Sequence, residues 1–250
     1  MRRTVSRRLF LSTSAGIFVT SAAGPRSLFS APVEGAPALL DHILLGSSDL
    51  ARGIDFVEKR TGVRAAFGGV HPGRGTCNAL LSLGEGTRLE PNPRRYLEII
   101  APDPAQSGAP DHYGLLKLTE PRLVGWAAHP GDLQQFATRL RNRDIAFDGP
   151  NPGSRKRPDG RLLQWKTLNL RDDRGGLLPF FIEWSADSWH PSVDAPRGCH
   201  LARFELLTPD PEELRNAEAA MGLGVEIAKS EKAQLRATIS CRTAALVLTS

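Results

Sequence analysis

The chain has 250 residues, of which 40% are hydrophobic and 24% charged, and this composition is ordinary for a soluble globular protein. Its formal net charge is +5, and four positive charges, Arg2, Arg3, Arg7 and Arg8, lie in residues 1–23, which contain no acidic residue. Without that segment the net charge would be 5 − 4 = +1, which argues against a nucleic-acid partner.

Residues 1–23 have the pattern of an export signal. Arg7 and Arg8 precede a weakly apolar run, residues 9–23, that ends in small residues. The segment is similar to a twin-arginine signal peptide, and the run is too short and too polar to span a membrane as a helix. We therefore expect a periplasmic or secreted protein, exported by the twin-arginine route, with no membrane contact after signal removal. A disordered basic N-terminus is the alternative.

Three cysteines, Cys77, Cys199 and Cys241, leave at least one thiol unpaired, and their spacing matches no zinc-binding pattern. In an oxidising compartment a disulfide between Cys199 and Cys241 is possible. Small buried thiols are the alternative.

The folded part is predicted to begin after a linker at residues 24–37, which is rich in Pro, Ser, Ala and Gly. A first module is predicted over residues 38–103, with a strand, a helix that starts at Asp49 and stops at Gly62, and then further strands. Asp at a helix start accepts an unpaired backbone N–H, and Gly ends helices in a left-handed cap. The predicted order is β-α-β-β-β.

The same order recurs further along the chain: a linker at residues 104–121, a second module at 122–186, a linker at 187–198 and a third, partial module at 199–250. Aligning Asp49 with Asp132 gives an offset of 132 − 49 = 83, and aligning Glu98 with Glu183 gives 183 − 98 = 85. Two anchors that agree within two residues indicate an internal repeat. The prediction is an α+β fold of repeated βαβββ modules, in which the third module covers a sheet edge and binds no metal.

Five segments carry a family resemblance: residues 40–50 (LDHILLGSSDL), 68–78 (GGVHPGRGTCN), 95–100 (RYLEII), 157–165 (RPDGRLLQW) and 179–184 (PFFIEW). Together they resemble the glyoxalase-like domain of the vicinal-oxygen-chelate superfamily. The resemblance implies that two modules curl into one cupped sheet, and that the first and last strands of each module supply inward side chains. The corresponding positions are His42, Glu98, Gly125 and Glu183.

From that resemblance, His42, Glu98 and Glu183 are predicted to bind a divalent metal ion (Zn, Mn, Fe, Ni or Mg). A carboxylate between apolar neighbours on a half-buried strand needs a partner, which is either a metal or an arginine. One imidazole and two carboxylates suit these metals. Gly125 has no side chain, so the four-ligand arrangement of glyoxalase I is incomplete. Buried salt bridges or solvated side chains are the alternative.

The predicted catalytic residues are Glu98, Glu183 and His71. His71 lies in a glycine-rich loop, where it would act as an acid, a base or a substitute ligand, or would only pin a turn together with Asn78. Other histidines, at positions 112, 129, 190 and 200, are expected at the surface or in caps. Substrate-binding predictions come from the glycine-rich loop, a charged loop at residues 153–161 and the tryptophans: Gly75, Thr76, Asn78, Trp126, Arg155, Arg157 and Trp165.

The favoured function is a metal-dependent isomerase or lyase that acts on a small anionic substrate with vicinal oxygens. An extradiol-type dioxygenase is compatible but less favoured, because such enzymes usually use two histidines and one carboxylate. A different class is a metal-free small-molecule binding or sequestering protein of the antibiotic-resistance type. The two classes differ in one respect: a metal requires His42, Glu98 and Glu183 to converge on one point, and a binding protein does not.

Overall fold

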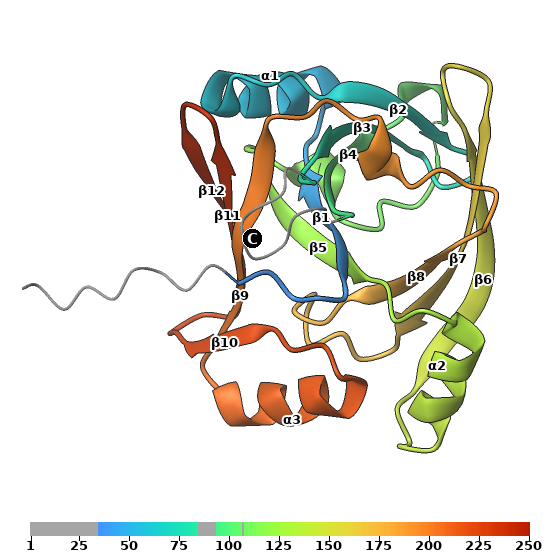
Figure 1. Ribbon diagram of the computed structural model, residues 1–250, viewed down its shortest axis with the longest axis vertical. Coiled ribbons are helices and arrows are strands. Elements are labelled where there is room, and N and C mark those ends of the chain that lie inside the picture. Colours follow the sequence, from blue (N-terminus) through green and yellow to red (C-terminus); the bar gives the residue numbers. More distant parts are fainter. Residues whose placement is uncertain (1–34, 85–93, 107) are drawn as a thin grey trace, which may run out of the picture. The chain divides into compact units, whose positions relative to one another are not determined.

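The first two predicted modules form the two halves of one eight-stranded sheet. In the computed structural model, which describes residues 35–84, 94–106 and 108–250, each half has the order β-α-β-β-β (Figure 1). The first half consists of β1 (Leu40–Gly46), α1 (Leu50–Thr61), β2 (Ala66–His71), β3 (Thr76–Ser82) and β4 (Tyr96–Pro102). The second consists of β5 (Arg122–Ala128), α2 (Leu133–Arg141), β6 (Phe147–Lys156), β7 (Leu162–Leu170) and β8 (Phe180–Trp184). The predicted signal peptide and most of the first linker lie outside the described residues.

The strands are ordered β2-β3-β4-β1-β5-β8-β7-β6, so the two halves meet where β1 and β5 pair in antiparallel fashion. In each half the first strand pairs in parallel with the last, β1 with β4 and β5 with β8. The sheet curls until its edge strands approach each other, and Arg155 of β6 donates a hydrogen bond to the backbone carbonyl of Gly68 in β2. The predicted α+β fold with a cupped sheet is confirmed.

The helices begin at the predicted residues. Asp49 caps α1 by accepting a hydrogen bond from the backbone N–H of Arg52 (2.8 Å), and Asp132 caps α2 in the same way. Gly62 ends α1 in the left-handed region, with φ of 73°, which favours glycine. Short 3-10 helices occur at Pro104–Gln106, Leu115–Lys117 and Pro191–Val193.

Residues 199–250 form a separate four-stranded sheet with one helix. Its elements are β9 (Cys199–Thr208), α3 (Pro211–Met221), β10 (Glu226–Lys229), β11 (Gln234–Cys241) and β12 (Ala245–Thr249), and Asp210 caps α3. The strand order is β10-β9-β11-β12, so the first strand lies between the second and the third rather than beside the last. The range therefore has the predicted order of elements but not the strand pairing of the two halves.

This smaller sheet packs against a face of the large sheet and does not cover one of its edges. Trp126 of β5 contacts Phe204 of β9, with ring centroids 5.1 Å apart, while the edge strands of the large sheet are β2 and β6. The expectation that the third module covers a sheet edge is wrong. The physical reason is that Trp126 and its neighbours present an apolar face that β9 and β11 bury.

A disulfide joins Cys199 of β9 to Cys241 of β11, which is the pairing considered from the sequence. Cys77 is a buried free thiol, and its burial raises the pKa of the thiol to about 11. None of the helices in the described part of the chain has the length and apolar character needed to cross a membrane.

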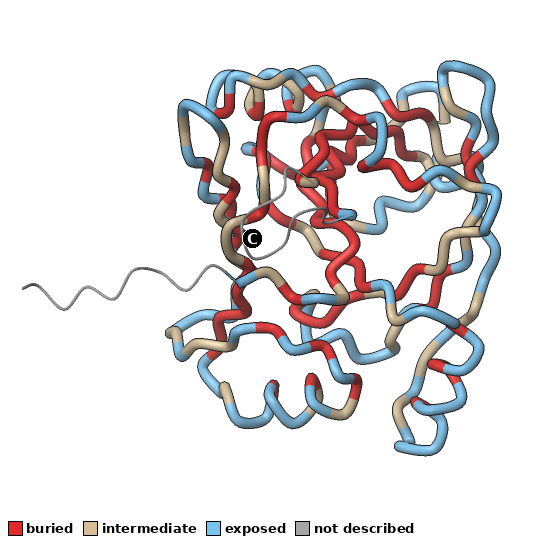
Figure 2. The backbone as a smooth tube through the Cα atoms, in the orientation of Figure 1, coloured by how far each residue is buried: buried red, intermediate tan, exposed pale blue. Residues whose placement is uncertain are grey.

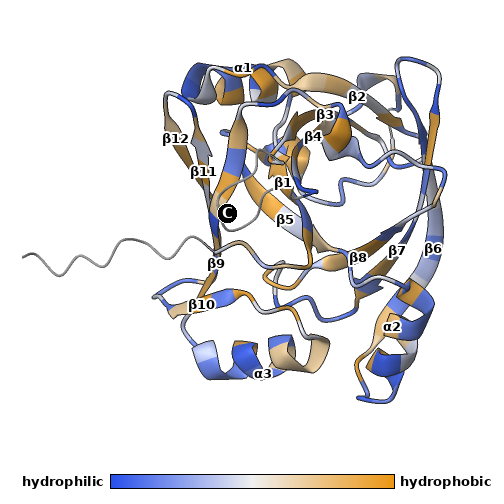
Figure 3. Ribbon diagram, viewed as in Figure 1, coloured by the Kyte–Doolittle hydropathy of each residue, from blue (hydrophilic) through white to orange (hydrophobic). Residues whose placement is uncertain are grey.

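The core lies between the sheets and beneath the helices. Figure 2 shows buried residues concentrated in β1, β3 and β4, and nearly every residue of these strands is buried. Figure 3 shows β5 as mostly hydrophobic and the edge strand β6 as mostly hydrophilic. Phe136 of α2 packs on Phe181 of β8, with ring centroids 4.3 Å apart, so α2 covers the side of the sheet to which Phe181 points.

Candidate functional site

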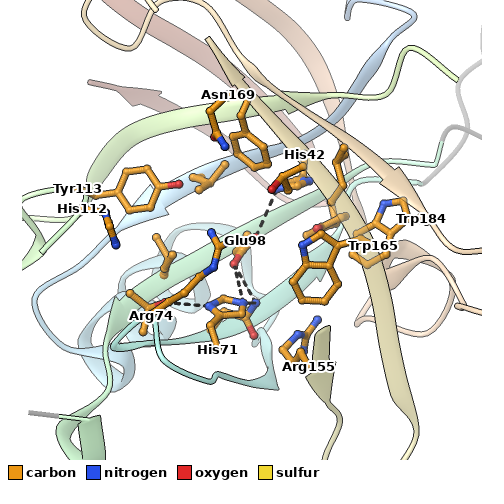
Figure 4. A pocket seen from close by; sticks show the side chains of 18 residues that line it. His42, His71, Arg74, Glu98, His112, Tyr113, Arg155, Trp165, Asn169 and Trp184 are labelled. Carbon is orange, nitrogen blue, oxygen red and sulfur yellow. Dashed lines mark hydrogen bonds and ion pairs between the residues drawn. The ribbon is translucent and has the colours of Figure 1, made fainter. Parts of the chain in front are cut away.

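A cavity of about 370 Å³ lies in the cup of the large sheet, a volume suited to a small ligand. Both halves contribute to its wall: β1, β2, β3 and β4 supply side chains from the first half, and β6, β7 and β8 supply side chains from the second. Figure 4 shows these side chains converging around Glu98.

Glu98 lies in the middle of this cavity and is 7% exposed. Its Oε2 lies 3.4 Å from Nε2 of His42, and its Oε1 lies 3.7 Å from Nε2 of His71. The side-chain amide of Asn78 donates a hydrogen bond to the same Oε1 at 2.8 Å. One carboxylate is therefore surrounded by two imidazoles and an amide.

Strand geometry explains why these residues meet. His42 of β1 pairs with Tyr96 of β4 in the parallel ladder, and Glu98 follows Tyr96 on the same face of that strand. The rings of His42 and Tyr96 stack with centroids 4.5 Å apart. Asn78 of β3 pairs with Ile100 in the next ladder, so its side chain also points into the cup.

The protonation of Glu98 follows from its neighbours. Burial alone raises the pKa of the carboxyl, but attraction to His42 and His71 and the hydrogen bond from Asn78 outweigh it, so the pKa is lowered. Burial lowers the pKa of His71, and the nearby Glu98 only partly opposes this change. At neutral pH the cavity therefore holds an ionised Glu98 beside a neutral His71.

Arg155 supplies a buried positive charge to the cavity wall. Its side chain is 3% exposed, and it donates a hydrogen bond to the backbone carbonyl of Gly68. In the described part of the chain, no carboxylate lies within the 4.0 Å of an ion pair with this guanidinium. Glu98 attracts this guanidinium across the cavity without forming an ion pair with it. A buried charge without a close counter-charge is unfavourable, so the cavity is suited to an anionic ligand.

Glu183, predicted as a ligand and a catalytic residue, is not in the cavity. Phe180, Ile182 and Trp184 of β8 line the cavity, and Glu183 points to the opposite face. There its Oε2 accepts a hydrogen bond from the backbone N–H of Leu133 at the start of α2 (2.7 Å). The prediction for Glu183 is wrong because strand alternation places it beside Phe181, under α2.

Two substrate-binding predictions are also wrong. Trp126 is buried in the core between the two sheets, where its indole N–H donates to the carbonyl of Leu177 (2.9 Å). Arg157 does not line the cavity and forms an ion pair with Asp194 at 2.6 Å. Gly75 is in the hairpin between β2 and β3 with φ of 66°, next to the cavity-lining Thr76 but not itself part of the wall.

Other predicted residues do lie together. The cavity wall includes His42, His71, Thr76, Asn78, Glu98, Arg155 and Trp165. The sequence predicts Arg155 in a loop, but residues 153–156 belong to β6, and this strand places the side chain of Arg155 in the buried wall of the cavity.

The predicted metal set does not fit, because Glu183 is on the wrong face. Among the residues that the structure describes, no group of three or more His, Cys, Asp and Glu side chains is placed to hold a metal ion. His42, His71 and Glu98 come nearest, but the amide nitrogen of Asn78 faces both Glu98 Oε1 and, at 3.3 Å, Nε2 of His71. A hydrogen-bond donor in that position occupies the lone pairs that a cation would need.

The sequence did not identify several cavity residues. Thr167 and Asn169 follow Trp165 at alternate positions of β7, so strand periodicity would have found them once Trp165 was placed. Arg74 and His112 come from connections between strands, where no periodic pattern predicts the direction of a side chain. The sequence predicts His112 only at the surface or in a cap, whereas the structure places it in the cavity wall. His190 does cap a helix, the 3-10 helix at Pro191–Val193, as predicted.

Comparison with known proteins agrees with this architecture. A family model described as a glyoxalase-like domain matches residues 40–222. A hypothetical protein from Staphylococcus aureus has the same fold, with a TM-score of 0.57, 12% identity and 84% of each chain covered. No curated protein matches the chain.

Methylmalonyl-CoA epimerases are also among the similar structures. The enzyme from Mycobacterium tuberculosis is 19% identical, with a TM-score of 0.42, and the match covers 63% of this chain and 94% of the other. A variant of the Streptomyces coelicolor enzyme in complex with 2-nitronate-propionyl-CoA is 18% identical, with a TM-score of 0.42, and the match covers 59% and 97%.

Proposed function

This chain belongs to the glyoxalase-like domain family of the vicinal-oxygen-chelate superfamily, and we propose that it is an enzyme of the isomerase or lyase type. It would move a proton on a small anionic substrate with vicinal oxygens, bound in the cup of the large sheet. The observation that supports this proposal is an ionised carboxylate, Glu98, buried in the same cavity as Arg155, a cation without a carboxylate partner among the described residues.

Substrate binding would begin at Arg155. Its guanidinium can donate two parallel hydrogen bonds to a carboxylate or to two neighbouring oxygens, which fixes the orientation of the substrate. The ligand would supply the negative charge that the buried guanidinium lacks. Trp165 and Trp184, whose ring centroids are 5.5 Å apart, would exclude water from one side of the ligand.

Glu98 would then accept a proton from the carbon next to the substrate carbonyl. The C–H bond breaks, its electron pair moves to the carbonyl oxygen, and Arg155 stabilises the resulting oxyanion. The substrate's negative charge also offsets the attraction between Glu98 and Arg155, which raises the proton affinity of the carboxylate when it is needed. Return of the proton to the other face would give isomerisation, and loss of a leaving group would give elimination.

Solvent exchange tests this proposal and does not require that the product be identified. The purified chain is incubated in D₂O with a panel of small carboxylates that carry an oxygen on the adjacent carbon, and deuterium at carbon is followed by ¹H NMR. We expect exchange of at least one compound, and a loss of about 100-fold or more in Glu98→Gln, the usual scale of general acid–base catalysis. Glu183→Gln is the matched control, because that carboxylate faces α2, and it should exchange at the wild-type rate.

A binding or sequestering protein is the second candidate, and the aromatic lining of the cavity favours it. Trp165, Trp184 and Phe180 offer stacking surface for a ligand that is held and not converted. The exchange experiment separates the two candidates. A compound that binds but exchanges no faster with the wild-type chain than with Glu98→Gln would support the binding protein and contradict the enzyme.

We also propose export by the twin-arginine route to the periplasm or the exterior. The disulfide between Cys199 and Cys241 supports an oxidising compartment, because such bonds are rare in the cytosol. Replacement of Arg7 and Arg8 by Lys keeps the charge and should leave the unprocessed chain in the cytoplasm. Normal export and processing of that variant would contradict this route.

A further inference from the structure

A second layer of polar side chains lies behind His42, centred on Asp41. The carboxylate of Asp41 is 3% exposed, and its Oδ1 lies 2.6 Å from Nδ1 of His42. Its Oδ2 lies 3.1 Å from Nε2 of His190 and accepts a hydrogen bond from Nε1 of Trp184, also at 3.1 Å. Side chains from two distant parts of the chain, residues 41–42 and 184–190, therefore meet at one carboxylate.

A β-bulge explains how two consecutive residues of β1 contact each other. The register between β1 and β5 shifts between Leu40 and His42, so Asp41 is the extra residue in the ladder. A regular strand would send the side chains of Asp41 and His42 to opposite faces, whereas a bulge re-aims one of them. The irregularity therefore has a local consequence: it places a carboxylate against the ring of His42.

The direction of each hydrogen bond at Asp41 can be assigned from its partners. Nδ1 of His190 accepts a hydrogen bond from the backbone N–H of Ser192 (3.3 Å), so the ring proton of His190 is on Nε2 and is donated to Asp41. The indole of Trp184 can only donate. Hydrogen bonds from His190 and His42 outweigh the effect of burial and hold the pKa of Asp41 well below its usual range, so the carboxylate carries no proton.

The remaining partner, Nδ1 of His42, must then donate as well. This leaves Nε2 of His42 directed at Oε2 of Glu98, 3.4 Å away. The ring has little freedom to turn, because it stacks on Tyr96 and meets Phe180 edge-on at 5.5 Å between centroids.

We propose that Asp41 is a positioning residue that holds His42 in the Nδ1–H tautomer, with Nε2 free to take a proton from Glu98, and that His190 and Trp184 hold Asp41 in place. The relay step rests on the proposed function, whereas the tautomer does not. In that step the O–H bond of protonated Glu98 breaks and an N–H bond forms at Nε2 of His42. The resulting imidazolium lies against the ionised Asp41, which stabilises it.

Nitrogen-15 NMR of the histidine side chains tests the tautomer directly, without a substrate. All six histidines of the chain lie among the described residues, and a His42→Gln variant identifies the resonances of His42 by their loss. We expect wild-type His42 to show a protonated Nδ1 and an unprotonated Nε2. A wild-type His42 that carries a proton on Nε2, either alone or together with one on Nδ1, would overturn the proposal, whatever the variants do.

Asp41→Asn is the informative variant. Two donors, His190 and Trp184, face one oxygen of Asp41, so the Asn carbonyl should turn to them and its amide nitrogen should face Nδ1 of His42. The amide donates, so His42 should switch to the Nε2–H tautomer. Glu183→Gln, on the other face of β8, should leave the tautomer unchanged. If Asp41→Asn folds and His42 keeps a protonated Nδ1, the carboxylate does not set the tautomer and the proposal fails.

Discussion

The side-chain amide of Asn78 lies 2.8 Å from Oε1 of Glu98, and the same nitrogen lies 3.3 Å from Nε2 of His71. Two acceptors that would otherwise repel each other thus share one donor. Among the described residues, the amide nitrogen of Asn78 lies where a metal ion bound by Glu98 and the two imidazoles would lie. The amide of Asn78 therefore determines whether a cation can bind beside Glu98 and His71, and substitution of Asn78 can test this.

Asn78→Asp should create a divalent metal site that the wild-type side chains do not form. The substitution replaces a donor with a carboxylate, so two carboxylates and two imidazoles would face one point and repel unless a cation or proton lies between them. Without metal, we expect the variant to be about 1–3 kcal/mol less stable than wild type, the usual cost of an unsatisfied buried group. Calorimetric titration with Zn²⁺ or Mn²⁺ measures the gain, and bound metal should restore stability.

The control for this prediction is the double variant Asn78→Asp with Glu98→Gln, which should lose the gained metal binding. One equivalent of metal bound by the wild-type chain, and lost in Glu98→Gln alone, would show that the amide does not exclude a cation.

Glu183 should affect stability and leave the cavity unchanged. Its carboxylate accepts a hydrogen bond from the N–H of Leu133 and lies 3.7 Å from Nζ of Lys166. Glu183→Ala should therefore lower the free energy of unfolding by about 1 kcal/mol, as the loss of a helix cap does. Urea denaturation measures this change. A variant that is as stable as wild type but has lost ligand binding would place Glu183 in the site after all.

The error at Glu183 has a simple geometric cause. The repeat was aligned with an offset of 183 − 98 = 85 between the last strands, but cavity-facing residues of β4 (Tyr96, Glu98) and of β8 (Phe180, Ile182) differ by even numbers. A slip of one residue moves a side chain to the other face of a strand. The repeat and the fold class depend on the order of helices and strands, and the helix caps depend on single Asp and Gly residues. A slip of one residue in a strand changes none of these, so they could be predicted from the sequence.

Other features of the site depend on tertiary contacts that no local pattern encodes. Asp41 faces His42 only because of a bulge, and His190 reaches Asp41 from a connection far along the chain. The sequence predicts Trp126 in the cavity wall because it follows Gly125. The pairing of β5 with β1 instead turns the side chain of Trp126 away from the cavity and into the core. His71 is the last residue of β2, and the hairpin that follows places its side chain in the cavity wall.

The pH dependence of stability should include a contribution from His71. Burial lowers its pKa, so between the unfolded value of about 6.5 and the lower folded value the unfolded chain binds more protons. Stability therefore falls as the pH falls through this window, by at most about 1.4 kcal/mol per pH unit for one group. His71→Gln should flatten the curve below about pH 6.5 in urea denaturation. An unchanged slope in the variant would mean that burial of His71 does not disfavour its charge.

Melting temperatures measured with added glycolate or oxalate at constant ionic strength show whether the cavity binds an anion through Arg155. A ligand that binds only the folded state stabilises it by about 2.7 kcal/mol at 100 times its Kd. Arg157→Gln is the matched control, because that neighbouring arginine already pairs with Asp194. We expect the melting temperature of the wild type and of Arg157→Gln to rise with at least one of these anions, and that of Arg155→Gln to show no rise. An equal rise in Arg155→Gln, or no rise in the wild type, would contradict anion binding through Arg155.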